Sequence, residues 1–266
     1  MNLNRVELSD IHHPRALAKA VHDQLGPVEC SIPVVRIAKE LGIGEVRLCA
    51  FDGLEGMLLT DRVHSRGSIL ANTLKGNRRA NFTVAHELGH FLLERHLFER
   101  TGFTCSAADM RVNAGSSRHQ RQEAEANEFA ISLLAPPYRV LPMLGSTPDL
   151  QDAVRLRNEL DISLEASVRL LIDFRAEPIA AIWSKGGRVR YFVTSRAFPS
   201  VSVKRGAMLR AETAAAELIA GKVQRMSEVV KTPSTAWTMK QGIPMGEQTR
   251  LGRDGYAVTL LFCGPL

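Results

Sequence analysis

The residues with the clearest chemical potential are the five from His86 to His90, which read His-Glu-Leu-Gly-His. Residues four apart lie on one face of a helix, so His86 and His90 can present two imidazole nitrogens to one metal ion. Glu87 lies at the edge of the same face, where it can accept a proton from a metal-bound water molecule. The spacing therefore predicts a hydrolytic metal centre with Glu87 as its general base.

The residues around this motif favour a buried site. The segment 82–93 is apolar at nearly every other position, which predicts a helix packed into the core. Burying two histidines and a glutamate is costly unless an ion binds them. The alternative is a surface helix with incidental histidines.

A catalytic zinc ion needs a third protein ligand and keeps one position for water. The helix expected at 120–134 offers three glutamates, Glu123, Glu125 and Glu128. Glu123 shares its helical face with Asn127 and two alanines, where another helix can approach closely and the amide can hydrogen-bond a ligand. The face that carries Glu125 is mixed. We therefore predict Glu123 as the third ligand, with Glu125 as the alternative.

Two stretches resemble the signature helices of the ImmA/IrrE family of metallopeptidases. They are residues 82–93, with the His-Glu-Leu-Gly-His sequence, and residues 123–136, which end in Leu-Leu-Ala-Pro. The strand expected at 69–72, followed by Arg78-Arg79, is also similar to that family. The clear resemblance covers about residues 30–137. It implies a zincin-like fold and a zinc endopeptidase of the gluzincin type that cleaves a helix-turn-helix transcriptional repressor, thereby derepressing stress-response or mobile-element genes.

In this interpretation His86, His90 and Glu123 hold Zn²⁺, and Mn²⁺ or another divalent ion can substitute in vitro. Glu87 accepts the proton of the attacking water and delivers it to the leaving amine. Residues 69–72 are expected to pair with an extended substrate as an added strand. The residue that stabilises the oxyanion stays open: Tyr138 and His119 are candidates, although structural roles are more common for such residues.

The cysteines and the other histidines are not expected to belong to the metal site. The four cysteines are scattered without paired spacing, which indicates a reduced cytoplasmic chain rather than a disulfide framework. Cys105 lies in the long segment 95–120 and could sense oxidation, but without an activating neighbour it is expected to be inert. His96 follows His90 by six residues and is expected to face solvent, as is the pair His12-His13.

The net charge of +6 is unevenly distributed along the chain. Residues 1–135 are neutral, residues 136–174 carry −2, and residues 175–266 carry 14 basic against 6 acidic residues, hence +8. All eight histidines precede residue 120, so histidine-based chemistry belongs to the N-terminal half. We predict a metallopeptidase domain at 1–137, a helical bridge with a helix-turn-helix-like pattern at 138–175, and a basic α+β, sensor-like module at 176–266.

Hydrophobic periodicity and turn residues predict an α+β fold. Helices are expected at 14–25, 31–41, 82–93, 120–134, 148–160, 164–174 and 207–220, and strands at 45–51, 56–60, 68–72, 179–183, 189–194, 227–230 and 257–263.

Composition and the N-terminus limit the classes of function. The chain is 45% apolar, no uncharged stretch reaches the roughly 18 residues that a membrane span requires, and no apolar run follows the N-terminus. We therefore expect a cytoplasmic protein without a membrane partner. The basic module could bind nucleic acid, but few aromatic side chains are available to stack on bases, which favours a sensor. The alternative function is a DNA-associated transcriptional regulator whose metal site is structural or sensory.

Overall fold

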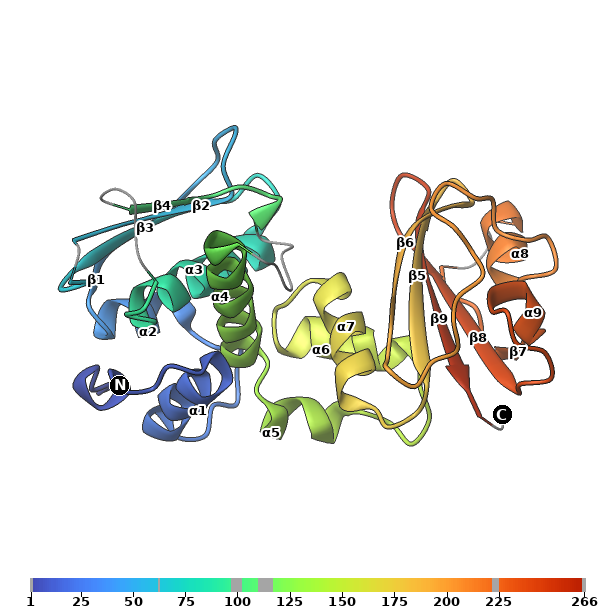
Figure 1. Cartoon of the computed structure of the whole chain (residues 1–266), viewed down its shortest axis with the longest axis horizontal. Coiled ribbons are helices and arrows are strands. Elements are labelled where there is room, and N and C mark those ends of the chain that lie inside the picture. Colours follow the sequence, from blue (N-terminus) through green and yellow to red (C-terminus); the bar gives the residue numbers. More distant parts are fainter. Residues whose placement is uncertain (1, 62, 97–101, 110–116, 222–224, 265–266) are drawn as a thin grey trace. The chain divides into compact units, whose positions relative to one another are not determined.

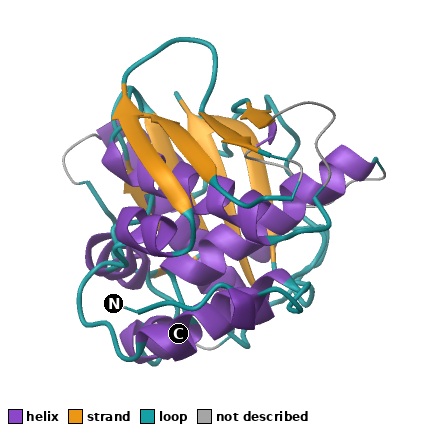
Figure 2. Cartoon of the chain, turned by 90° about the vertical axis from the view of Figure 1, so that its left-hand side faces the viewer, coloured by secondary structure: helices purple, strands orange, loops and turns teal. Residues whose placement is uncertain are grey.

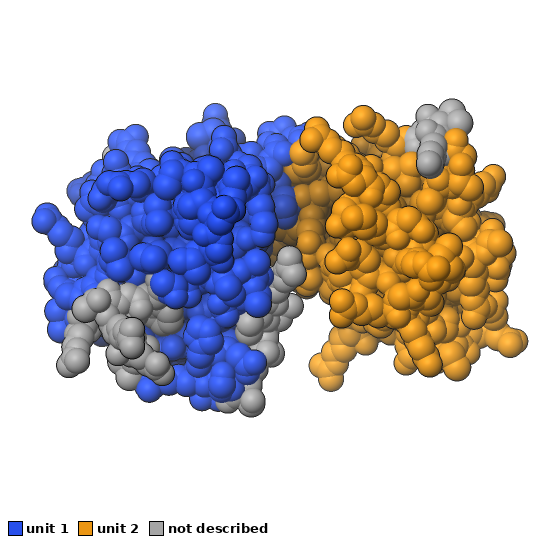
Figure 3. All heavy atoms as spheres, turned by 90° about the horizontal axis from the view of Figure 1, so that it is seen from above, with its two compact units in different colours: residues 1–140, 158–163 blue, residues 141–157, 164–266 orange. Residues whose placement is uncertain are grey.

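The computed structural model of the chain describes residues 2–61, 63–96, 102–109, 117–221 and 225–264 (Figure 1). It consists of two compact units, which are coloured separately in Figure 3. The first comprises residues 1–140 and 158–163, and the second comprises residues 141–157 and 164–266. Each unit holds one β-sheet within the described residues, and the mixture of helices and strands confirms the α+β class. The three-part division made from the sequence stays a prediction.

The sheet of the first unit has the strand order β1-β3-β2-β4 in the described residues. Its strands are β1 (Ile43–Cys49), β2 (Gly56–Thr60), β3 (Gly67–Asn72) and β4 (Gly102–Cys105). Strand β3 is parallel to β1 and antiparallel to β2, while β4 pairs antiparallel with β2 and forms an edge. Because its backbone groups are paired on both sides, β3 offers no free edge. The expectation that a substrate pairs with residues 69–72 is therefore wrong.

The helices of the first unit lie on one side of this sheet in Figure 1, and Figure 2 shows the same layering from the side. They are η1 (Val6–Leu8), α1 (Pro14–Leu25), α2 (Val34–Glu40), α3 (Asn77–Leu92), α4 (Arg118–Leu134) and α5 (Pro137–Val140). Helix α3 packs against β2, β3 and α4. A Cβ added at Gly89 would lie 2.9 Å from Phe129 Cδ1, so glycine permits the close approach of α3 and α4.

The second unit is built on a sheet of order β6-β5-β9-β8-β7. Its strands are β5 (Ile179–Lys185), β6 (Arg188–Thr194), β7 (Val230–Lys231), β8 (Met245–Leu251) and β9 (Tyr256–Cys263). The remaining helices are η3 (Leu141–Met143), α6 (Leu150–Glu159), α7 (Leu164–Phe174), α8 (Ala214–Gly221) and α9 (Ser234–Trp237). Trp237 is fully buried, and its Nε1 donates to the buried carboxylate of Glu247 at 3.0 Å. The same carboxylate accepts a hydrogen bond from the backbone of Ala215, which ties α8 to the sheet.

Most predicted elements are confirmed, with differences that have local causes. Helix α3 begins five residues earlier than expected, at Asn77, because its first turn is polar and carries no apolar period. The helix expected at 207–220 starts only at Ala214, where the hydroxyl of Thr213 accepts a hydrogen bond from the Ala216 backbone. Strands β4 and β8 were not expected. Within the described residues, no helix is both long enough and apolar enough to cross a bilayer.

Candidate metal centre

Helix α3 places the two motif histidines on one face, as their spacing predicts. Both side chains are fully buried, and their Nε2 atoms lie 3.0 Å apart. Every residue from Thr83 to Leu92 is buried, because the helix is covered by the sheet on one side and by α4 on another. The imidazoles therefore converge in the interior of the first unit rather than on its surface.

Helix α4 brings Glu123 to the same point. One carboxylate oxygen lies 3.2 Å from His86 Nε2, and the other lies 3.3 Å from His90 Nε2. The helix begins with a capping box in which the Ser117 hydroxyl accepts a hydrogen bond from the Gln120 backbone. Ala126 is fully buried, so the small residues of this face allow the close contact with α3. The structure thus brings together the three residues that the sequence suggested as ligands.

A fourth side chain joins them from the edge strand. Cys105, the last residue of β4, is fully buried, with its Sγ 3.4 Å from His86 Nε2. The ligand atoms of His86, His90, Cys105 and Glu123 all lie within 4.8 Å of one another. Cys105 is therefore not a lone cysteine, whereas the expectation that it is chemically inert stays a prediction. The sequence held no local signal for this contact, because pairing between β4 and β2 creates it.

Outer hydrogen bonds fix the orientation of both imidazoles. His86 Nδ1 lies 3.0 Å from Asn127 Oδ1, so this nitrogen donates and Nε2 keeps its lone pair. His90 Nδ1 lies 2.9 Å from His96 Nδ1, and His96 Nε2 lies 2.9 Å from a carboxylate oxygen of Glu125. With His96 Nε2 donating to Glu125, His96 Nδ1 accepts from His90, so His90 Nε2 carries the lone pair that a metal ion would bind.

This chain of contacts corrects one expectation and gives Glu125 a role. His96 is fully buried rather than exposed, because the chain turns back after α3 and its backbone bonds to Leu93. Glu125, on the mixed face of α4, pairs with both His96 and Arg95. Asn127 has the orienting contact that the helical face suggested.

Glu87 lies beside the cluster in a water-excluded position. It is fully buried, and neither carboxylate oxygen makes a hydrogen bond of good geometry within the described residues. Strand β2 covers it closely, since a Cβ added at Gly56 would lie 2.7 Å from Glu87 Oε1. Burial raises the pKa of the Glu87 carboxyl well above its ordinary value, and the charge of Glu123 adds to this, whereas the Cys105 thiol opposes it. Such a carboxyl is suited to taking up and returning a proton.

The pKa values of three neighbouring groups are lowered, in contrast to that of Glu87. Burial lowers the pKa of His90 to about 3 and that of His96 to about 4, so both imidazoles are neutral at neutral pH. Burial alone would raise the pKa of Glu123, but its contacts with His86 and His90 outweigh that effect and hold the pKa well below its usual range. Glu123 therefore favours its ionised form, and a cation held by the cluster would favour the ionised form of Glu87 as well, in which Glu87 can accept a proton.

This donor set fits a divalent transition metal. It combines two imidazoles, a carboxylate and a thiol in a dry interior, which are the ligand types that zinc binds in proteins. Both oxygens of Glu123 lack a hydrogen bond of good geometry among the described residues, which is costly for a buried carboxylate. A cation at the convergence point would compensate that charge. The identity of the ion is not determined by these ligands alone.

The other candidate residues lie elsewhere or at the rim. His119 is half-exposed, with Nε2 3.3 Å from Asp109 Oδ1 and Nδ1 3.8 Å from Glu123 Oε1. Tyr138 lies instead against His22 of α1, with its hydroxyl 3.4 Å from Nδ1. His12-His13 is exposed, as expected. Neither Tyr138 nor His119 gains a specific oxyanion role from these contacts.

In this α+β unit, a buried His-Glu-x-x-His helix packs against a sheet and against a second helix that carries a glutamate. This is the architecture of a metallopeptidase-like domain. Residues 40–170 match the family model Peptidase_M78, described as the IrrE N-terminal-like domain. This part of the chain is therefore similar to the IrrE N-terminal-like domain, and the resemblance to the ImmA/IrrE family is confirmed.

A solved structure shares the fold over nearly the whole chain. It is a Mycobacterium tuberculosis transcriptional regulator, with a TM-score of 0.56 and 15% sequence identity. The alignment covers 97% of this chain and 79% of the regulator. No curated protein matches the chain. The similarity establishes the fold.

The two glutamates of α4 can be separated by metal affinity. Glu123→Gln removes a charged group that faces both imidazoles, so we expect metal affinity to fall by more than about 100-fold. Glu125→Gln only weakens the support of His96, so a loss of about 10-fold or less is expected. Competition with a chromophoric chelator measures both. Equal losses, or a larger loss for Glu125→Gln, would exclude Glu123 as the ligand.

Proposed function

We propose that this chain is a zinc-dependent endopeptidase that cleaves a specific protein substrate. The observation that carries the proposal is the position of Glu87. It lies fully buried and without a good hydrogen bond beside the convergence point of His86, His90 and Glu123. A structural metal site has no use for such a carboxylate, whereas a hydrolytic site requires a base there.

The chain's own residues have distinct roles in this mechanism. His86, His90 and Glu123 would hold the zinc ion, and Asn127 and His96 keep the two imidazoles oriented. When bound, zinc supplies Lewis-acid activation of a water molecule and of the scissile carbonyl. Glu87 accepts the proton of the attacking water and delivers it to the leaving amine. Strand β2 excludes bulk water from Glu87.

The proposed substrate is a helix-turn-helix transcriptional repressor, whose cleavage would derepress stress-response or mobile-element genes in the cytoplasm. The family resemblance supports this substrate class. The test is to incubate the purified, zinc-loaded chain with small helix-turn-helix repressors of its source organism, beginning with any that is encoded beside it, and to follow fragments by mass spectrometry. Two discrete fragments that disappear with chelator are expected. Intact repressors under all conditions would contradict the proposal.

A second candidate function is a DNA-associated regulator with a closed metal site. The fourth donor, Cys105, favours it, since four protein ligands are typical of structural zinc. The +8 charge of residues 175–266 would then contact DNA. Glu87 opposes this candidate, because nothing in a closed structural site employs it.

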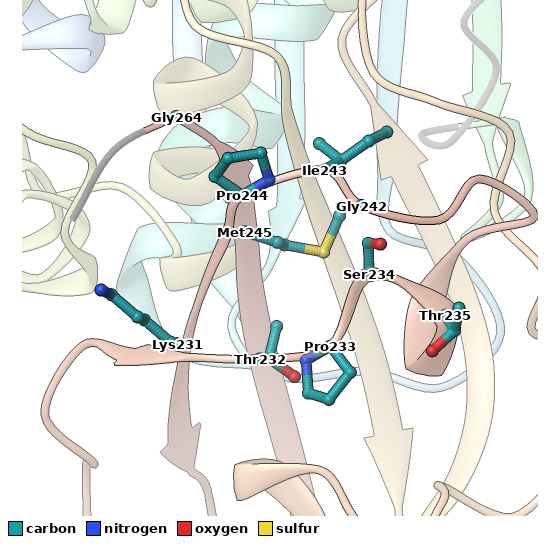
Figure 4. A pocket seen from close by; sticks show the side chains of 10 residues that line it. All are labelled: Lys231, Thr232, Pro233, Ser234, Thr235, Gly242, Ile243, Pro244, Met245 and Gly264. Carbon is teal, nitrogen blue, oxygen red and sulfur yellow. The ribbon is translucent and has the colours of Figure 1, made fainter.

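For the C-terminal module we propose a sensor role. The second unit contains a pocket of about 520 Å³, shown in Figure 4, which is within the range of small-molecule sites. Lys231, Ser234 and Met245 are among its lining residues, from the β7–α9 segment and the start of β8. Lys231 is the only cation among the described lining residues, whereas a phosphate backbone is usually held by several basic side chains, so the pocket suits a small organic ligand better.

The sensor and DNA-binding roles differ in their dependence on salt. We expect the full chain to bind duplex DNA only weakly at about 50 mM salt and to show no measurable binding at about 200 mM salt. Fluorescence anisotropy with an unrelated duplex and with the chain's own promoter measures this. Tight binding that falls steeply with salt would favour the DNA-associated regulator instead.

A further inference from the structure

The cluster around the metal centre contains one donor more than an open hydrolytic site needs. Three protein ligands leave the fourth tetrahedral position of zinc for water. Cys105 is fully buried, and its Sγ lies 3.4 Å from His86 Nε2, within the same 4.8 Å cluster as Glu123. A thiolate is a strong zinc ligand, so this sulfur is placed to take the position that water would otherwise hold.

Strand β4 holds this cysteine at the edge of the sheet. Cys105 lies opposite Gly56 in the β2–β4 ladder, and its carbonyl accepts a hydrogen bond from the Glu55 backbone at 2.9 Å. Gly56 is also the residue that lies against the Glu87 carboxylate. Strand β4 therefore occupies the edge of β2 beside the general base, where an extended peptide could otherwise add as a strand.

We propose that Cys105 is the fourth ligand of the metal centre and that β4 closes it, so that the structure represents a resting form of the peptidase. This inference rests on the proposed function, because it concerns access to the same metal. It predicts that β4 and substrate compete for one sheet edge. It also predicts that water and small anions reach the metal only after the sulfur has left.

A resting form accounts for the site better than a permanently structural one. Glu87 is buried beside the cluster without a good hydrogen bond, which a structural site would not require. Strand β4 has four residues and pairs only with β2 among the described strands, so its displacement breaks few backbone hydrogen bonds. On opening, the metal–sulfur bond breaks and the released thiolate takes up a proton. No oxidant is needed for this step.

Cobalt is the probe that tests the ligand directly. The full chain, freed of metal and loaded with Co²⁺, should show a near-ultraviolet thiolate-to-cobalt charge-transfer band. Cys105→Ser and Cys105→Ala should lose the band while still binding about one cobalt ion per chain. Cys49→Ser is the matched control, because Cys49 is a partly buried cysteine on β1 of the same sheet but outside the cluster.

Azide then tests whether the fourth position is closed. Added to the cobalt protein, azide should change the visible spectrum of the Cys105 variants at a concentration at least about tenfold lower than for the original chain or Cys49→Ser. In those two proteins, only a minor population with an open fourth position can bind azide. Absence of the charge-transfer band in the original chain would overturn the proposal. Equal azide affinity in the original chain and the Cys105 variants would overturn it as well. Neither measurement on the original chain depends on how well a variant folds.

Cleavage separates this inference from the proposed function. If both hold, Cys105→Ser should cleave the cognate repressor at least about tenfold faster than the original chain. If the cobalt band and the azide difference are present but no form of the chain cleaves any candidate repressor, the peptidase function fails while the ligand assignment stands.

Discussion

Replacing Glu87 by glutamine is expected to lower the rate of repressor cleavage by about 10²–10⁴-fold while leaving one metal ion bound per chain. Glutamine has nearly the same shape but cannot accept the proton of the attacking water. The carboxylate makes no hydrogen bond of good geometry within the described residues, so its replacement breaks no structural network. Because burial raises the pKa of Glu87, removing this carboxyl should also not weaken the fold. Rates come from gel or mass-spectrometric time courses, and metal content from elemental analysis.

Glu128→Gln is the control for this experiment, because Glu128 lies on α4 outside the cluster and pairs with Arg15 at the surface. It should leave both cleavage and metal content unchanged. Full cleavage by Glu87→Gln would refute the role of Glu87 as general base. Loss of metal in this variant would instead place Glu87 among the ligands.

The local part of the site could be predicted from the sequence because helical geometry is local. The i, i+4 spacing of His86 and His90 determines that they share a face wherever α3 lies, and the alanines around Glu123 indicate which face of α4 turns inward. The structure brings these three side chains together. Burial of the whole helix also follows from its apolar sequence.

The contacts made by Cys105 and His96 could not be predicted in this way. Cys105 reaches the site through β4, whose pairing with β2 joins residues almost fifty positions apart. His96 reaches His90 because the chain turns after Leu93. Both contacts depend on tertiary arrangement, which the periodicity of a single segment does not encode.

Buried polar residues explain the missed strand β8. Glu247, Gln248 and Thr249 are all buried, so this strand lacks the alternation of apolar and polar residues on which strand prediction depends. Their polar groups are satisfied by partners distant in sequence, such as Trp237 Nε1 for Glu247 and the Leu150 backbone for Gln248. A polar sequence can therefore form a central strand once the fold supplies its hydrogen bonds.

His86→Ala and His90→Ala should each abolish metal binding, with affinity falling by more than about 100-fold and no cleavage remaining. Each substitution removes one of the two imidazoles whose Nε2 atoms lie 3.0 Å apart, and the remaining donors then hold the ion weakly. His22→Ala is the control: His22 is also buried in the first unit, but its Nε2 bonds to the Leu133 carbonyl at 2.8 Å, outside the cluster. That variant should lose stability yet retain its metal. Elemental analysis and chelator competition distinguish these results, and full metal occupancy in both His86→Ala and His90→Ala would exclude the centre as the metal site.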